Sequence, residues 1–449
     1  MLFITGDNVH CVSFLFLQLH IPLFCTKYVL NQLAIMPDPK HPLSQYVFVV
    51  FADDWGRHPS SCQHLFLRII PHVQVIWVNT IGLRTPRFNL HDFKRTMQVI
   101  HSWIRPHTRF KTRSPERTRQ IANGCSAPSA SNAVFPYIVN PVMWPSFRGP
   151  TSTALNHHLL SGAVHEALRH VAPGKHPILV STSPIVPGLF RDHIFKRKIY
   201  YCVDDFTHWH GINGPAMHRL EQQTLHACDL MIATSTSILD TRSPFASAST
   251  LLTHGVDLAH FSGASPDPDS PLAALPHPVV GMFGVFDQRV DGQALRAAAR
   301  LSPQASFVVL GPVVDRQPGE FHDVPNLHFL GAVPYADLPG HVAHFDLCIL
   351  PYVVDASTWN INPLKLKEYL ATGKPVIASP LPEATRLAAY LTLAAPDAFP
   401  QAVASALATI EAGPAVQSDA ARTRLDDFLQ SESWEAKAKS FLSDVMDDL

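Results

Sequence analysis

One segment in the C-terminal part of the chain combines a cation and a carboxylate at a spacing that suits a nucleotide. Residues 363–380 read PLKLKEYLATGKPVIASP, which predicts a helix that stops at Gly373 and is followed by a short buried strand. Lys365 and Glu368 are three positions apart and therefore share one face of that helix. Together they can contact the phosphates and the ribose of one ligand. The alternative is an exposed ion pair on a surface helix, which would contribute little.

This segment resembles the C-terminal signature of GT-B glycosyltransferases, especially family 4 (group 1) and its branch that makes exopolysaccharides and cell-wall polysaccharides. The resemblance implies that Glu368 contacts the ribose of a nucleotide-sugar donor. In that family a second glutamate, with seven residues between the two, contacts the donor sugar, and Asn360 stands at its place here. Asparagine can donate and accept hydrogen bonds to sugar hydroxyls, but it carries no negative charge.

A second element of this half of the chain has a glycine-bearing strand end. The strand 279–284 ends at Gly284 and is followed by Arg289, where glycine permits close approach and the guanidinium can bind phosphate oxygens. The alternative is an ordinary turn with a solvated arginine. The fingerprint GxGxxG of dinucleotide-binding dehydrogenases is missing. The resemblance places a diphosphate between Arg289 and Lys365.

The loop before the motif helix is rich in polar residues. It follows the apolar strand 346–351 and should therefore lie at the ligand-binding edge of a parallel sheet. We expect Asn360 and Trp359 to contact the donor sugar. Asn362 precedes Pro363 and is predicted to cap the helix.

In the first half of the chain a polar loop follows the first predicted strand. Such a loop suits a saccharide acceptor, because carboxylates can orient a hydroxyl and an aromatic ring can stack on a sugar. The alternative is a solvated turn in which Ser60 caps the next helix. The predicted acceptor-binding residues are Asp53, Asp54, Trp55, Arg57 and His58.

A matching cluster follows the strand 198–203 and contains Asp204, Asp205 and His208. Glycosyl transfer needs a group that takes the proton of the acceptor hydroxyl, and a carboxylate or histidine can do so. These three residues are therefore the catalytic candidates, the alternative being a polar strand end. The histidines lack the spacing of a zinc site, and Asp267-Pro-Asp269 lies in a proline-rich segment. We expect no metal and no cofactor, since the resemblance implies that protein cations act in place of a metal.

The composition is that of a globular protein of two domains. The chain has 449 residues, of which 46% are hydrophobic and 16% charged, and this length favours two cores. A net charge of −1 argues against nucleic acid as a partner. The seven cysteines are scattered without a CxxC pair, so neither a disulfide framework nor a thiolate zinc site is expected and a cytoplasmic location is favoured.

Alternating strand and helix patterns predict an α/β protein with parallel sheets. The resemblance implies the GT-B fold, with two Rossmann-like domains facing across a cleft and a C-terminal helix that crosses back to the first. We expect an acceptor-binding domain at 44–261, a linker at 262–278, a nucleotide-sugar-binding domain at 279–430 and the crossover helix at 431–449. The predicted strands are 46–52, 73–78, 134–139, 177–182, 198–203, 229–234, 250–253, 279–284, 306–311, 326–330, 346–351 and 375–378, and helices are predicted at 61–70, 91–104, 154–171 and 215–228.

Two segments could bear on membranes. Residues 11–30 are apolar, but no Lys or Arg precedes them and no cleavage pattern follows, so we interpret 1–43 as an extension, with a native start at Met36. The segment 103–119 is strongly basic and 134–147 is apolar. Both could contact an anionic membrane, although a solvated loop is the alternative.

The sequence therefore predicts a metal-independent glycosyltransferase. It would move a sugar to a saccharide acceptor on a lipid carrier during synthesis of a surface polysaccharide, at the inner face of the membrane. The resemblance implies a UDP-sugar as the default donor. Two alternatives are a GT-B nucleotide-sugar epimerase and an inactive homologue that acts as a scaffold, the latter because of Asn360.

Overall fold

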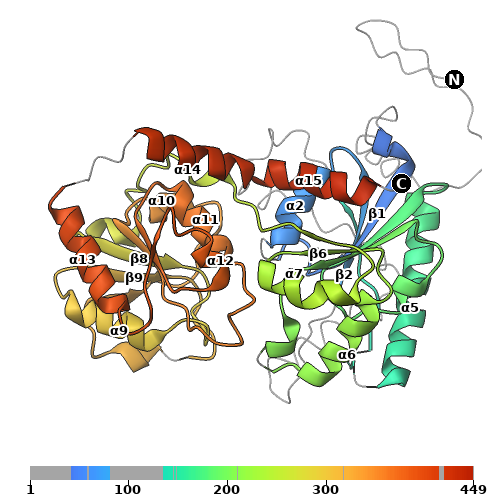
Figure 1. The fold of residues 1–449 in the computed structure, drawn as a ribbon, viewed down its shortest axis with the longest axis horizontal. Coiled ribbons are helices and arrows are strands. Elements are labelled where there is room, and N and C mark those ends of the chain that lie inside the picture. Colours follow the sequence, from blue (N-terminus) through green and yellow to red (C-terminus); the bar gives the residue numbers. More distant parts are fainter. Residues whose placement is uncertain are drawn as a thin grey trace, which may run out of the picture.

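The computed structural model describes residues 42–57, 60–80, 135–144, 146–147, 149–209, 211–316, 318–413, 419–447 and 449. Within them lie two sheets built only from parallel strands, placed side by side (Figure 1). The predicted helix 91–104 and the segments 1–41 and 103–119 lie outside the described residues.

The first sheet has seven strands in the order β3-β2-β1-β4-β5-β6-β7. Its interior strand β1 is buried along its whole length and pairs with β2 and β4. The strands are β1 (Tyr46–Ala52), β2 (Gln74–Asn79), β3 (Tyr137–Val139), β4 (His176–Ser181), β5 (Arg197–Cys202), β6 (Leu230–Ala233) and β7 (Ser249–Leu251). Its helices are α2 (Ser61–Ile69), α5 (Pro150–Val171), α6 (Gly214–Leu225), α7 (Thr236–Arg242) and α8 (Leu258–Phe261).

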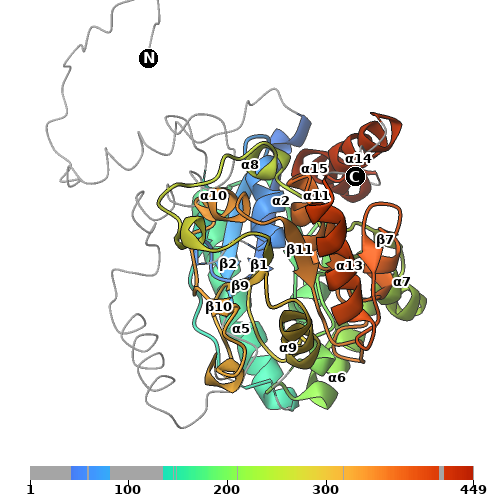
Figure 2. The same cartoon turned by 90° about the vertical axis from the view of Figure 1, so that its left-hand side faces the viewer.

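The second sheet has six strands in the order β10-β9-β8-β11-β12-β13. In Figure 2 this domain faces the viewer, with α9 and α13 packed side by side. The strands are β8 (Val279–Phe283), β9 (Ser306–Leu310), β10 (Leu327–Phe329), β11 (Leu347–Leu350), β12 (Val376–Ala378) and β13 (Thr392–Leu393). The helices are α9 (Gly292–Leu301), α10 (Leu338–Val342), α11 (Leu364–Ala371), α12 (Pro382–Thr385) and α13 (Phe399–Glu411), and α14 (Asp419–Ser431) and α15 (Trp434–Met446) follow them.

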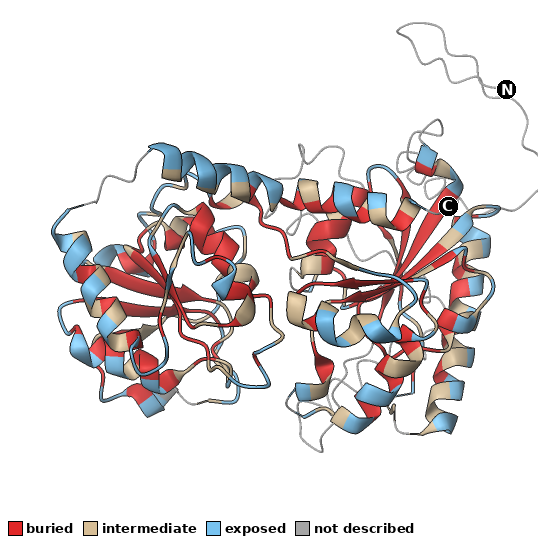
Figure 3. Cartoon of the chain, in the orientation of Figure 1, coloured by how far each residue is buried: buried red, intermediate tan, exposed pale blue. Residues whose placement is uncertain are grey.

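The alternation of side chains along β1 explains why helices cover both faces of the first sheet. Phe48 and Val50 point into one core, shared with α2 and α15, whereas Val49 and Phe51 point into the other, shared with α5. Because successive strand residues face opposite sides, a strand that is apolar at every position must be covered twice. Figure 3 shows the resulting layers, with buried strands between helices that are exposed on their outer sides.

The last two helices connect the domains. In Figure 1 α14 and α15 run along one side of both sheets. Trp434 and Phe441 of α15 are buried in the core of the first domain, while Leu429 of α14 belongs to the core of the second. The predicted return of the chain to the first domain is therefore observed, and the fold is GT-B.

The strand order reverses between β1 and β4 in one sheet and between β8 and β11 in the other. In open parallel sheets ligands bind at the carboxyl ends of the strands beside such a reversal. The loops after β5 and β6 contact the loops after β11 and β12 through hydrogen bonds between the domains. The ligand-binding edges of the two sheets therefore face each other.

Candidate functional site

The lysine of the motif helix lies over Gly284, the glycine that directly follows β8. Gly284 has a φ of +117°, and a Cβ at this position would overlap Cε of Lys365. The missing side chain therefore leaves the space that the lysine occupies, in a backbone conformation that other residues rarely adopt. Gly284 and Lys365, which the sequence predicted to share a donor site, lie together.

We expect Gly284→Ala to displace Lys365 and to weaken UDP binding about tenfold, the equivalent of one lost ion contact. The new methyl group would meet the lysine and strain the backbone. Calorimetric titration with UDP measures the effect. Gly319→Ala is the matched control, because a Cβ at Gly319 meets nothing within 4 Å. Equal UDP affinities for the two variants would contradict this placement of Lys365.

Glu368 lies one turn further along α11 and is 4% exposed. Burial raises the pKa of its carboxyl from 4.5 to about 7, against the opposing effects of the Lys365 charge and a hydrogen bond with Tyr335. A buried carboxylate without a full set of donors is costly. Two ribose hydroxyls would supply donors to it, which fits the predicted ribose contact.

We expect Glu368→Gln to stabilise the unliganded protein at high pH. Since the folded-state pKa is raised, the folded protein holds this proton more tightly than the unfolded chain, and stability falls as pH rises from 4.5 to about 7. The neutral amide does not titrate, so the variant keeps this part of the free energy of unfolding. Its advantage over the wild type is up to about 3 kcal/mol above pH 7 and vanishes below pH 4.5. Urea unfolding at pH 5 and pH 8 tests this. An equal change in stability at both pH values would argue against a buried, titrating Glu368.

Arg289 interacts with Asp287 in its own loop and, through its charge, with Asp204 of the first domain. Its guanidinium donates to the carboxylate of Asp287, with Nη2 2.7 Å from Oδ2. Burial disfavours the charged form, but the hydrogen bonds and charge of Asp287, with further help from Asp204, hold the pKa above its usual value. Its side chain remains 37% exposed, so the permanently charged guanidinium has donors left for a phosphate.

The two aspartates after β5 have different surroundings. Burial raises the pKa of Asp204, against hydrogen bonds from the Asp205 N–H and Trp209 and the charge of Arg289. A raised pKa suits a group that accepts a proton near neutral pH. Asp205 instead pairs with Arg242, 2.7 Å away, and His208 lies 3.9 Å from it with an exposed side chain. The structure thus brings the three catalytic candidates together. Their surroundings differ, since Asp204 is partly buried, Asp205 is paired with Arg242 and the His208 side chain is exposed.

The loop after β11 docks on the first domain. Nδ2 of Asn360 donates to Asp205 over 2.8 Å, and the carbonyl of Asn360 accepts from Ser235 Oγ. Asn362 donates to the carbonyl of Thr234 over 2.6 Å. The predicted cap at Asn362 is therefore wrong, because its side chain serves this contact and no side chain caps α11. The ring of Trp359 stays exposed.

The loop after β1 is only partly available to an acceptor. Trp55 is 2% exposed, with its ring 4.7 Å from that of Trp77. The predicted stacking of Trp55 on a sugar does not hold in this structure, because the ring is enclosed in the core. Asp53 accepts from Ser60 and Gln63, which anchors the loop to α2.

The other acceptor candidates lie outside the core. Asp54 and Arg57 form an ion pair of 3.7 Å, with the Arg57 side chain 48% exposed. His58 lies outside the described residues. Ser60 caps α2 and accepts from the Gln63 N–H, as the alternative interpretation of this loop predicted. Asp53, Asp54 and Arg57 stay predictions for acceptor contacts.

The sequence analysis missed two residues that hold the candidate site in place. Arg242, at the end of α7, binds Asp205 and lies 3.5 Å from Glu221. Gln63 organises the loop after β1 by donating to Asp53 and accepting from the Gly56 N–H. Gln63 had a sequence signal, since it stands three residues after a predicted cap. Arg242 had none, because both of its partners come from other elements.

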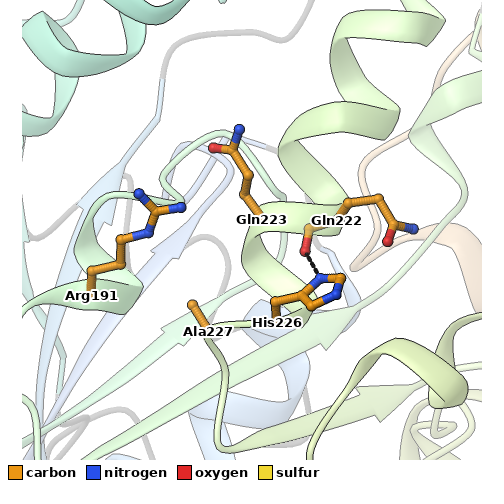
Figure 4. Close-up of a pocket in the computed structure, with 5 residues that line it drawn as sticks. All are labelled: Arg191, Gln222, Gln223, His226 and Ala227. Carbon is orange, nitrogen blue, oxygen red and sulfur yellow. Dashed lines mark hydrogen bonds between the residues drawn. The ribbon is translucent and has the colours of Figure 1, made fainter.

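Other features of the described residues lie away from this edge. The described residues contain no group of three or more His, Cys, Asp or Glu side chains arranged to hold a metal ion. A pocket of about 330 Å³ is lined by Arg191, Gln222, Gln223, His226 and Ala227 (Figure 4). These residues precede β5 and β6 and so lie toward the amino ends of the strands, opposite the donor site. Within the same ranges, no helix has the length and hydropathy to span a membrane.

A known protein family matches the part of the chain that contains the donor-site candidates. Residues 277–411 match the family model of the glycosyl transferases group 1, and this range contains Gly284, Arg289, Lys365 and Glu368. The chain carries a group 1 glycosyltransferase domain. TuaH of Bacillus subtilis (strain 168), whose name describes a glycosyltransferase of teichuronic acid biosynthesis, is 23% identical over 298 residues, which cover 61% of this chain and 75% of TuaH.

Solved structures share the fold of this chain. Sucrose-phosphate synthase from Thermosynechococcus elongatus superposes with a TM-score of 0.61 at 16% identity and covers 88% of this chain and 97% of its own. HepE of Anabaena, in complex with UDP and glucose, has a TM-score of 0.56 at 14% identity and covers 90% and 100%. At these identities the likeness establishes the GT-B architecture.

Proposed function

We propose that this glycosyltransferase moves a sugar from a UDP-sugar to a saccharide acceptor carried on a lipid, during synthesis of a surface polysaccharide. The observation that carries the proposal is the position of Lys365 over Gly284 with the buried Glu368 one turn away. This arrangement lies in the part of the chain that matches the family model. The name of TuaH supports polysaccharide synthesis, and the UDP in the HepE structure supports the nucleotide.

Each part of the donor has a proposed contact. Glu368 accepts from the ribose hydroxyls, Lys365 and Arg289 bind the diphosphate, and Asn360 binds the sugar. The two side-chain cations stabilise the charge that develops on the leaving nucleotide, so the proposal needs no metal. The proposed site thus takes two of its contacts from loops, Arg289 and Asn360, and two from helix α11.

The acceptor enters from the first domain. Asp204 is proposed to take the proton of the attacking hydroxyl, because its pKa is raised and the charge of Arg289, from the donor side, acts on it. Asp53, Asp54 and Arg57 are proposed to bind the acceptor sugar. His208, whose ring lies 3.9 Å from Asp205, is proposed to lie beside the reacting hydroxyl.

A peripheral contact with the inner face of the membrane fits the proposed acceptor and a cytoplasmic location. In the described part of 134–147, Trp144 is 53% exposed and Val142 36%. Exposed apolar side chains, in a chain whose sequence also has a basic segment at 103–119, suit an anionic lipid surface. Binding to vesicles with and without anionic lipid tests this part of the proposal.

A screen of nucleotide sugars tests the function itself. A true donor should raise the melting temperature by mass action, and incubation with it should release the free nucleotide. Conversion of the donor to its epimer without release of nucleotide would favour the epimerase. A chain that binds nucleotide sugars but turns none of them over would favour the scaffold.

A further inference from the structure

A carboxylate of the first domain holds the amide that is proposed to bind the donor sugar. Asn360 Nδ2 donates to Asp205 Oδ2 over 2.8 Å, although the two residues are 155 positions apart in the chain. The backbone carbonyl of Asn360 is fixed at the same time by Ser235 Oγ at 2.8 Å. Side chain and backbone of Asn360 are thus both attached to the opposite domain.

Asp205 has its acceptor positions occupied. Oδ1 accepts from the N–H and the hydroxyl of Thr207, and Oδ2 accepts from Arg242 and Asn360. Its side chain is only 6% exposed. Such a carboxylate has little capacity left for an acceptor hydroxyl or for its proton. Its position indicates a fixed anion rather than a base.

Arg242 forms the ion pair that holds the Asp205 carboxylate in place. The guanidinium lies 2.7 Å from Asp205 and 3.5 Å from Glu221, and its side chain is 12% exposed. Glu221 in turn accepts from the hydroxyl of Tyr200 at 3.1 Å. Arg242 therefore links a buried carboxylate of α6, Glu221, to Asp205, the carboxylate that faces Asn360.

We propose that Asp205 and Arg242 are positioning residues for the donor-sugar contact of Asn360, and that residue 360 must be an amide as long as residue 205 is a carboxylate. The inference rests on the proposed function. The NH2 group of Asn360 is used by Asp205, which turns the amide oxygen into the acceptor offered to a sugar hydroxyl. A carboxylate at 360 would have no hydrogen to donate and would stand beside the fixed charge of Asp205, where two carboxylates repel.

A double-mutant cycle with shape-conserving substitutions tests the inference. Asn360→Asp and Asp205→Asn are measured singly and together, by calorimetry, with UDP and with the UDP-sugar that stabilises the wild type most among UDP-glucose, UDP-galactose, UDP-N-acetylglucosamine and UDP-glucuronate. Each single change should weaken UDP-sugar binding about tenfold and leave UDP binding within about twofold. The double variant should recover most of the loss, because one amide again faces one carboxylate, a coupling of the size measured for contacting pairs.

The outcomes separate the inference from the function on which it rests. Additive effects of the two changes, or a wild-type affinity in Asn360→Asp, overturn the inference alone. Failure of the wild type to bind UDP and every UDP-sugar overturns the proposed function and the inference with it. If a charge variant does not fold, Asn360→Ala replaces it: weaker binding of the UDP-sugar with unchanged binding of UDP supports the inference, and an equal loss for both overturns it.

Discussion

Asp204→Asn is expected to lower turnover of the donor by about 10²- to 10⁴-fold, the usual contribution of a positioned acid or base. Burial raises the pKa of Asp204, and the charge of Arg289 acts on it from the donor domain. The amide keeps the shape but cannot take a proton from the attacking hydroxyl. Release of UDP from the selected donor measures the loss, while the affinity for UDP should change by less than about twofold.

The control for Asp204 is an exposed carboxylate of the same domain. Asp240 on α7 is exposed, and Asp240→Asn should leave turnover at the wild-type level. A turnover of Asp204→Asn within about threefold of the wild type would exclude a proton-transfer role for Asp204. His208, whose ring lies 3.9 Å from Asp205, would then be the next candidate for the base.

Arg242→Met is expected to cost about 3–5 kcal/mol of stability, because it leaves two buried carboxylates without their cation. Asp205 and Glu221 have side chains that are 6% and 3% exposed. Hydrogen bonds from Thr207 and the charge of Arg242 outweigh the burial of Asp205 and hold its pKa below its ordinary value. Urea unfolding measures the loss, which should shrink as the pH falls and the carboxylates take up protons.

A surface arginine provides the matched comparison. Arg300 pairs with Asp323 and its side chain is 58% exposed. Since exposed pairs contribute little, Arg300→Met should cost at most about 1 kcal/mol. Equal losses of unfolding free energy in the two variants would show that the buried ion pairs of Arg242 stabilise the protein no more than an exposed pair does.

Much of the architecture could be predicted from the sequence because the strands are short apolar runs between turn residues. Every predicted strand overlaps one of β1 to β12. β13 was missed because it has only two residues, and α7 because its residues are mostly polar. The exact domain boundaries stay predictions.

The candidate site was predictable where its residues are close in sequence. Lys365 and Glu368 share a helix face, and Gly284 ends an obvious strand. The partners across the domain contact were not predictable, since Asp205 meets Asn360 only after both sheets have formed. The burial of Trp55 was hidden for a similar reason, because Trp77 of the neighbouring strand covers it.

Calorimetric titration of UDP into the wild type and into Glu368→Ala tests the central claim most directly. The nucleotide should bind the wild type, and removal of the buried carboxylate should weaken binding about tenfold or more, the usual effect of losing hydrogen bonds to a charged group. The variant should remain folded. Unchanged UDP affinity in a folded Glu368→Ala protein would contradict the placement of the nucleotide beside α11.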